Sequence, residues 1–424
     1  MREKGFAPLV ILVTVAILSV LGLLGFFAFQ NPQGKPKPRT ELILQQPTQE
    51  PQTTLSLSTN LRADSVLSIT SNGKYWLLSY PCDGLYKYEE GKTTKIPRPS
   101  DESDSWVNNI EWNGKYWLFS SKDVYTCIKD EIRKASLQVF DGINFTDHTK
   151  SFDSSSECKV DKISSLSWNG KRWLILSRTF LDPKTTQACV VAFDGQNFVD
   201  LTAFLRKNLD LTNFSFGSLN CNVSFCVATL QSKREDELAF FKLNFEEASV
   251  ESIKSSNFAD YSAFARSVKY VDIVGSNETS LILKLNYQFL EADSRKLNAS
   301  TITELYEYDG KRAQLLYKYS SPYLPKDTPV EDVVKAFEGL FEPEKAVWDP
   351  FQKKWFIVGF TSIRGNVENE LVILEVTKDY KTEQLKYNPP IINKATDVGN
   401  IAVTEEGILI EEPFTKIILI KFQN

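Results

Sequence analysis

The sequence predicts an all-β repeat domain that follows a single membrane-spanning segment. Three observations support this: an uncharged apolar run near the N-terminus, a proline-rich stretch after it, and a short phrase that recurs along the rest of the chain. With 42% hydrophobic and 12% aromatic residues, the 424-residue chain is well able to pack a core. The formal net charge of −5 and the single histidine argue against nucleic-acid binding and against histidine-based metal or triad chemistry.

The N-terminal segment 1–30 is predicted to be a transmembrane anchor. Residues 6–29 carry no charge, and a helix of this length crosses the hydrocarbon core. A cleaved secretory signal is the alternative, but the run is long for one and lacks an Ala-x-Ala site. Residues 31–52 are rich in Pro, Gln and Lys and are predicted to be a flexible tether. The short segment before the apolar run and the six cysteines favour an extracytoplasmic domain, at the cell surface or in a periplasm-like space.

A phrase containing Asn-Gly-Lys between aromatic and apolar residues recurs in residues 71–79, 112–120 and 168–177. Asn-Gly between two β-rich runs favours a type I′ hairpin, because both central residues of that turn need positive φ. A second phrase, Phe-Asp-Gly-x-Asn-Phe, follows at residues 140–145 and 193–198 and predicts a second hairpin. The repeating unit is therefore four antiparallel strands, which is what a propeller blade requires.

These units predict a single β-propeller over residues 53–424. The expected blades lie near residues 65–97, 107–150, 163–204, 215–255, 267–319, 344–387 and 398–423. The last has room for three strands, and we expect Thr53–Leu61, which resembles residues 198–205, to supply the fourth and close the ring. A row of β-sandwich domains is the alternative, but each sandwich needs about seven strands in about 100 residues.

The blade phrases resemble propeller repeats in general. No Trp-Asp pair recurs from repeat to repeat as in WD40 propellers, since Trp348-Asp349 is a single occurrence, and the chain lacks the Gly-Gly doublet of kelch repeats and the aspartate box of sialidases. The resemblance therefore implies the fold and no particular function. Four tryptophans recur at one position of the repeat, which indicates packing between blades; they are Trp76, Trp117, Trp173 and Trp355.

The cysteines are expected to form disulfides. Cys221 and Cys226 take the two tryptophan positions of the fourth blade, so they should lie opposite each other on one hairpin. The other expected pairs are Cys82 with Cys127 and Cys158 with Cys189. Half of a zinc site is the alternative for the first pair, although no histidine is near.

Function is expected on the face that carries the longer connections, because variable loops on a rigid scaffold usually hold binding sites. Small polar residues begin the inner strands on that face, and arginines lie in the neighbouring loops. The candidate ligand-binding residues are Asn108, Asn109, Ser164, Ser165, Asn400, Arg133, Arg178 and Arg364. Packing around the axis is the alternative reason for the small residues. The same face should carry a helix over residues 328–341, with its apolar stripe on the blades.

The sequence favours a membrane-anchored extracytoplasmic propeller that serves as a binding or scaffold module for a protein or glycan. The alternative is a propeller hydrolase or lyase acting on polysaccharide or peptide, with carboxylates such as those of Asp123, Asp182 and Glu368 at the channel mouth. We expect no catalytic residue, metal, cofactor or nucleic-acid partner. His148 is expected to be exposed on an outer strand and to have no catalytic role.

Overall fold

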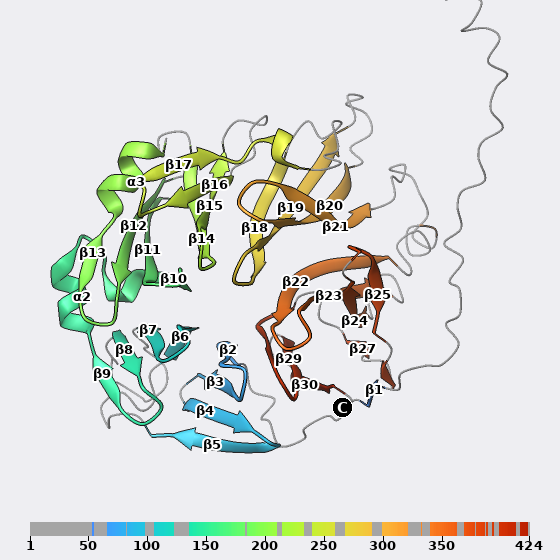
Figure 1. Cartoon of the computed structure of the whole chain (residues 1–424), viewed down its shortest axis with the longest axis horizontal. Helices are drawn as coiled ribbons and strands as arrows, with labels where there is room; N and C mark the ends of the chain where they lie inside the picture. The colour runs from blue at the N-terminus through green and yellow to red at the C-terminus, as the bar shows by residue number, and fades with distance from the viewer. Residues whose placement is uncertain are drawn as a thin grey trace, which may run out of the picture. The chain divides into compact units, whose positions relative to one another are not determined.

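In residues 52–424 the strands surround an axis in seven blades (Figure 1). The computed structural model describes residues 53–54, 66–81, 83–97, 106–122, 135–182, 185–209, 214–232, 240–258, 268–290, 299–320, 332, 340–362, 369–377, 379–385, 387–388, 392–393, 398–412 and 416–422. The predicted anchor and tether lie outside these residues. Within the described part of the chain, no helix has the length and apolar character needed to cross a membrane.

Six of the blades contain four consecutive antiparallel strands, and in the sixth blade a further short strand, β27 (Ile392–Asn393), joins the same sheet. The first three are β2 (Ser68–Ser71), β3 (Trp76–Tyr80), β4 (Gly84–Glu89) and β5 (Lys92–Ile96); β6 (Trp106–Trp112), β7 (Trp117–Lys122), β8 (Ser136–Phe140) and β9 (Phe145–Asp147); and β10 (Ile163–Trp168), β11 (Trp173–Asp182), β12 (Thr185–Phe193) and β13 (Phe198–Asp200). The next three are β14 (Phe214–Cys221), β15 (Cys226–Ser232), β16 (Phe240–Asn244) and β17 (Ser249–Ser252); β18 (Val268–Ser276), β19 (Leu281–Leu290), β20 (Ala299–Tyr308) and β21 (Ala313–Ser320); and β22 (Phe341–Asp349), β23 (Lys354–Ser362), β24 (Asn369–Val376) and β25 (Thr382–Gln384).

The seventh blade has three described strands, β28 (Ile401–Thr404), β29 (Gly407–Glu412) and β30 (Lys416–Lys421). In all seven blades the first strand is the innermost, and each contacts the inner strand of the next blade, in the order β2, β6, β10, β14, β18, β22, β28 and back to β2. The seven-bladed propeller predicted from the repeats is confirmed.

The ring closes through direct contacts between the first and last blades. The indole nitrogen of Trp76 donates to the carbonyl oxygen of Ala402 at 3.2 Å, and the Ser71 hydroxyl donates to the carbonyl of Val403. Of the expected closing strand, the structure describes only β1 (Thr53–Thr54), which pairs in parallel with β26 (Tyr387–Asn388) and not with the last blade. Closure by the remaining residues of that segment stays a prediction.

The core lies between the blades. Among the described residues, seven clusters of buried apolar side chains occupy the seven interfaces between neighbouring blades. The four recurring tryptophans are at most 3% exposed, as expected for packing side chains. Each interface therefore draws its stability from burial of large side chains on both sides.

A tryptophan pair in the inner hairpin of the third blade occupies the same position as a disulfide in the fourth blade. Trp168 lies opposite Trp173 where β10 meets β11, and Cys221 lies opposite Cys226 at the same place in the fourth blade. These cysteines form a disulfide, and a second disulfide joins Cys158 to Cys189. Both pairings confirm the prediction. The expected Cys82–Cys127 pair lies outside the described residues.

Short helices follow two of the outer strands, where the sequence pattern predicted longer strands. They are α2 (Thr149–Ser155) and α3 (Thr202–Asn208), and each places a buried side chain, Phe152 or Leu205, in the core between its blade and the next. His148 is the residue before α2, and the prediction that it is exposed was wrong. Its ring is partly buried, 4.9 Å from the ring of Phe193, and burial lowers the pKa of the imidazole.

The expected helix over residues 328–341 lies almost wholly outside the described residues. Its last position, Phe341, instead begins β22 and is buried against Tyr317, with ring centroids 5.2 Å apart. The assignment of Phe341 to the helix was wrong because a strand residue facing a neighbouring blade is as apolar as a residue on the buried side of a helix.

Candidate functional site

The two faces of the propeller are built from different connections. The short-turn face carries the turns between first and second strands and between third and fourth strands, most of which are held by an Asn or Asp side chain that accepts backbone hydrogen bonds. In the second blade, for example, Asn113 Oδ1 accepts from the backbone nitrogens of Lys115 and Tyr116 at 2.9 and 2.6 Å. The long-loop face carries the other connections, such as those from β7 to β8 and from β21 to β22.

Bulges interrupt the inner strands near the long-loop face. In the second, third, fourth and sixth blades the bulge begins four residues before the Trp or Cys that closes the inner hairpin. The residues at these four bulges are Asn108, Ser164, Gly217 and Glu344. A bulge frees its residue from the regular hydrogen-bond ladder and re-aims its side chain, so it is a suitable place for a polar group near the axis.

The predicted site residues of the second and third blades lie at these bulges. Asn109 donates its side-chain amide to Ser120 Oγ at 2.9 Å, and the Ser164 hydroxyl donates to the carbonyl of Leu176 at 3.2 Å. Asn108 Nδ2 and Ser165 Oγ are buried and have no hydrogen-bond partner among the described residues. Buried polar atoms are nearly always paired, so these two groups mark a place where a water or ligand atom is needed.

Two other predicted residues connect neighbouring blades. Arg178, on β11, donates from Nη1 to the carbonyl oxygen of Gly217 at 2.5 Å, and burial lowers the pKa of its guanidinium. Asn400 donates from Nδ2 to Glu411 at 2.5 Å and to the carbonyl oxygen of Leu67 at 3.3 Å. Both side chains are therefore committed to holding the inner strands together.

The sixth blade adds a charged group that sequence reasoning missed. Glu344, at its bulge, forms an ion pair with the buried Lys284 at 3.3 Å, and Asp272 lies opposite Lys284 in the strand register. The signal in the sequence was the position of Glu344, four residues before Trp348, which corresponds to that of Asn108 before Trp112.

The remaining predicted residues are not brought to this site by the described structure. Arg133 and Arg364 lie outside the described residues, as do the acidic residues Asp123 and Glu368, while Asp182 ends β11. Among the described residues, no group of His, Cys, Asp and Glu is arranged to hold a metal ion.

No protein-family model and no curated protein sequence matches the chain. Solved structures with a similar fold include a chain of the mitotic checkpoint complex, which is 9% identical with a TM-score of 0.45. The match covers 89% of this chain and 98% of that one. The WD40 propeller domain of Doa1 is 10% identical with a TM-score of 0.44, covering 87% and 96%. A GH74 xyloglucanase from Xanthomonas campestris is 9% identical with a TM-score of 0.46, covering 88% and 53%.

Proposed function

We propose that the chain is a binding or scaffold module that engages a protein or glycan partner at its long-loop face, around the mouth of the axis. The observation that carries this proposal is the pair of buried, unpartnered groups on the neighbouring inner strands β6 and β10, Asn108 Nδ2 and Ser165 Oγ. Binding sites combine a rigid frame with a few convergent polar groups, and these two groups belong to strands that neighbouring blades hold in place.

The long connections supply the rest of the surface. Polar groups at the bulges fix the orientation of a ligand, and the loops above them set its identity. The ion pair of Lys284 with Glu344 provides charge of both signs on the far side of the axis, which suits a polar partner better than an apolar one.

Substitution of the unpartnered groups tests this proposal. Asn108→Leu and Ser165→Ala remove polar atoms that have no partner, so the fold should lose little or no stability, whereas a partner that uses them should bind more weakly. Asn109→Leu is the matched control, because it breaks the bond to Ser120 and should lower stability.

The measurements are thermal unfolding, a glycan array, and proximity labelling on intact cells with the full-length chain. Loss of one set of glycans or labelled proteins in the first two variants, with unchanged unfolding, supports the proposal. Identical binding profiles for wild type and both variants would remove the axis mouth as the site.

We further propose that residues 6–29 anchor the propeller on the outer side of a membrane. The uncharged run and the two disulfides support this, because disulfides persist in oxidising compartments. Deletion of residues 1–30 should release the chain from alkali-washed membranes. Protease added to intact cells, or to cells whose outer envelope has been removed, should cleave the full-length chain, and a chain that is fully protected in both would contradict the outward orientation.

A further inference from the structure

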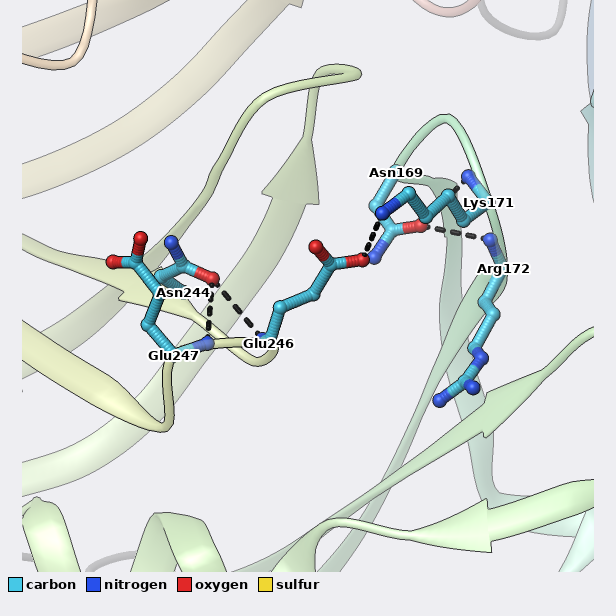
Figure 2. A network of polar contacts seen from close by, with 6 residues as sticks. All are labelled: Asn169, Lys171, Arg172, Asn244, Glu246 and Glu247. Atoms are coloured by element: carbon cyan, nitrogen blue, oxygen red, sulfur yellow. Dashed lines mark hydrogen bonds and ion pairs between the residues drawn. The ribbon is translucent and has the colours of Figure 1, made fainter.

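The short-turn face holds a small pocket between the third and fourth blades. It measures about 90 Å³ and lies among the β10–β11 turn, the β14–β15 turn and the β16–β17 turn. Lys171 and Glu246 reach across from opposite sides and meet at 2.5 Å (Figure 2). Sequence reasoning placed function on the opposite face, so nothing in the proposed function accounts for this pocket.

The polar groups that line the pocket are mostly hydrogen-bond donors. Asn169 Oδ1 accepts from the backbone nitrogens of Lys171 and Arg172, and Asn244 Oδ1 accepts from those of Glu246 and Glu247 (Figure 2). Their carbonyl oxygens are thus in use, and within the described part of the chain both side-chain amide nitrogens have no partner. Each turn therefore holds its amide rigidly and presents an NH₂ group.

Two further donors complete the set. The Ser224 hydroxyl is exposed at the pocket wall, and the ammonium of Lys171 is at its mouth. A ligand that meets mostly donors must be an acceptor, and among acceptor-only groups a carboxylate also carries the negative charge that complements Lys171. Its size also fits, because about 90 Å³ corresponds to roughly three water molecules.

Glu246 occupies the position that such a ligand would take. The side chains of Lys171 and Glu246 are 69% and 62% exposed, and an ion pair in that setting contributes at most about 1 kcal/mol. Exchange of Glu246 for another carboxylate on Lys171 therefore costs little. Phe225 and Leu243 form an apolar floor, and Val223 at the edge is 49% exposed, which offers a contact for the residues that flank the carboxylate.

We propose that this pocket binds a carboxylate presented by an acidic segment of a partner protein, with Glu246 acting as an internal competitor. The proposal is independent of the function assigned to the long-loop face, since the two sites lie on opposite faces and share no residue.

Saturation-transfer NMR on the full-length chain tests it with three small probes. N-acetyl-aspartate N-methylamide carries a side-chain carboxylate, N-acetyl-alanine carries a terminal carboxylate, and N-acetyl-asparagine N-methylamide is the neutral analogue. We expect one or both carboxylates to bind and the neutral analogue to bind at least about tenfold more weakly, as loss of a charge-assisted hydrogen bond implies. Whichever carboxylate probe binds more tightly shows whether the partner presents a side-chain carboxylate or a terminal one.

Two variants should change carboxylate binding in opposite directions, and a third serves as the control. Lys171→Gln should weaken carboxylate binding by up to about fivefold, and Glu246→Gln should strengthen it, since it removes the competitor. Lys115→Gln is the matched control, because Lys115 occupies the same turn position in the second blade and does not line this pocket. Equal weakening in the Lys115 and Lys171 variants, weakening in the Glu246 variant, or tight binding of the neutral analogue would each overturn the proposal.

Discussion

The backbone nitrogen of Trp168 donates to the carboxylate of Glu111 at 3.1 Å, so a side chain of the second blade completes the hydrogen bonds of the third. The next interface uses the same geometry, with the nitrogen of Cys221 donating to the Ser167 hydroxyl at 2.8 Å. A serine is neutral at every pH, whereas burial raises the pKa of Glu111 to about 7, an effect that outweighs the opposing one of the Trp168 hydrogen bond. Of these two interfaces, the one between the second and third blades is therefore the one that responds to pH.

Glu111→Gln should remove a pH dependence of stability. Because the folded pKa is raised above the usual 4.5, the folded chain holds this proton more tightly, and its stabilising effect is lost as pH rises from about 4.5 to about 7. Wild type should lose about 3 kcal/mol relative to the glutamine variant over that range, and the two should run parallel above it. Denaturant unfolding at pH 4.5, 6 and 8 measures this. Equal profiles for wild type and Glu111→Gln would contradict the assignment.

Trp76 and Trp117 are equally buried but differ in one hydrogen bond. The indole nitrogen of Trp76 donates to Ala402 across the ring closure, whereas that of Trp117 has no partner among the described residues. Trp76→Phe should therefore cost about 1 kcal/mol more than Trp117→Phe, because it removes a hydrogen bond that Trp117→Phe does not remove. Chemical denaturation of both variants gives the difference, and equal losses would show that the bond to Ala402 adds nothing to closure.

The repeats could be recognised in the sequence because most blades have the same types of residue at the same positions. Asn-Gly and Asp-Gly turns need particular residues, and the large side chains opposite each other, Trp168 with Trp173 and Cys221 with Cys226, mark where the inner hairpin ends. These local requirements predict blade number and two disulfides. The helices α2 and α3 were missed because seven residues give too little periodicity to separate a helix from a strand.

The candidate site was only partly predictable, for a different reason. Small polar residues at the start of an inner strand suggested Asn108 and Ser165 as site residues. Asn400 and Arg178 were equally good candidates in the sequence, but their side chains prove to be bonded to neighbouring blades. Whether a polar atom is satisfied depends on contacts between blades, which no single repeat contains. The pocket on the short-turn face was missed for the same reason, since Lys171 and Glu246 are 75 residues apart.

The two disulfides should contribute unequally to stability. Cys158 and Cys189 are 31 residues apart, and Cys221 and Cys226 only 5, so the first closes a much longer loop in the unfolded chain. On the chain-entropy account, replacing the first pair by alanine should cost about 1.5 kcal/mol more than replacing the second. Unfolding of the two double variants under oxidising conditions measures this, with reduced wild type as the reference. A larger loss for the Cys221–Cys226 pair would indicate that packing at the tryptophan position outweighs chain entropy.

Gly114 and Gly170 occupy the same position in two Asn-Gly turns and have nearly the same backbone, with φ of 92° and 87°. An added Cβ at Gly114 would meet no atom within 4 Å, whereas at Gly170 it would lie 2.9 Å from the Cβ of Val223 in the next blade. Gly114→Ala should therefore cost only the strain of a left-handed backbone, about 1–2 kcal/mol, and Gly170→Ala should cost more because it also pushes two turns apart. The double variant Gly170→Ala with Val223→Gly separates the two effects: it removes the clash and should return the loss to that of Gly114→Ala, apart from any cost of the second glycine measured in Val223→Gly alone. Thermal unfolding of the four variants checks this, and equal losses for the two single alanine variants would mean that the turns of neighbouring blades are not in contact at this point.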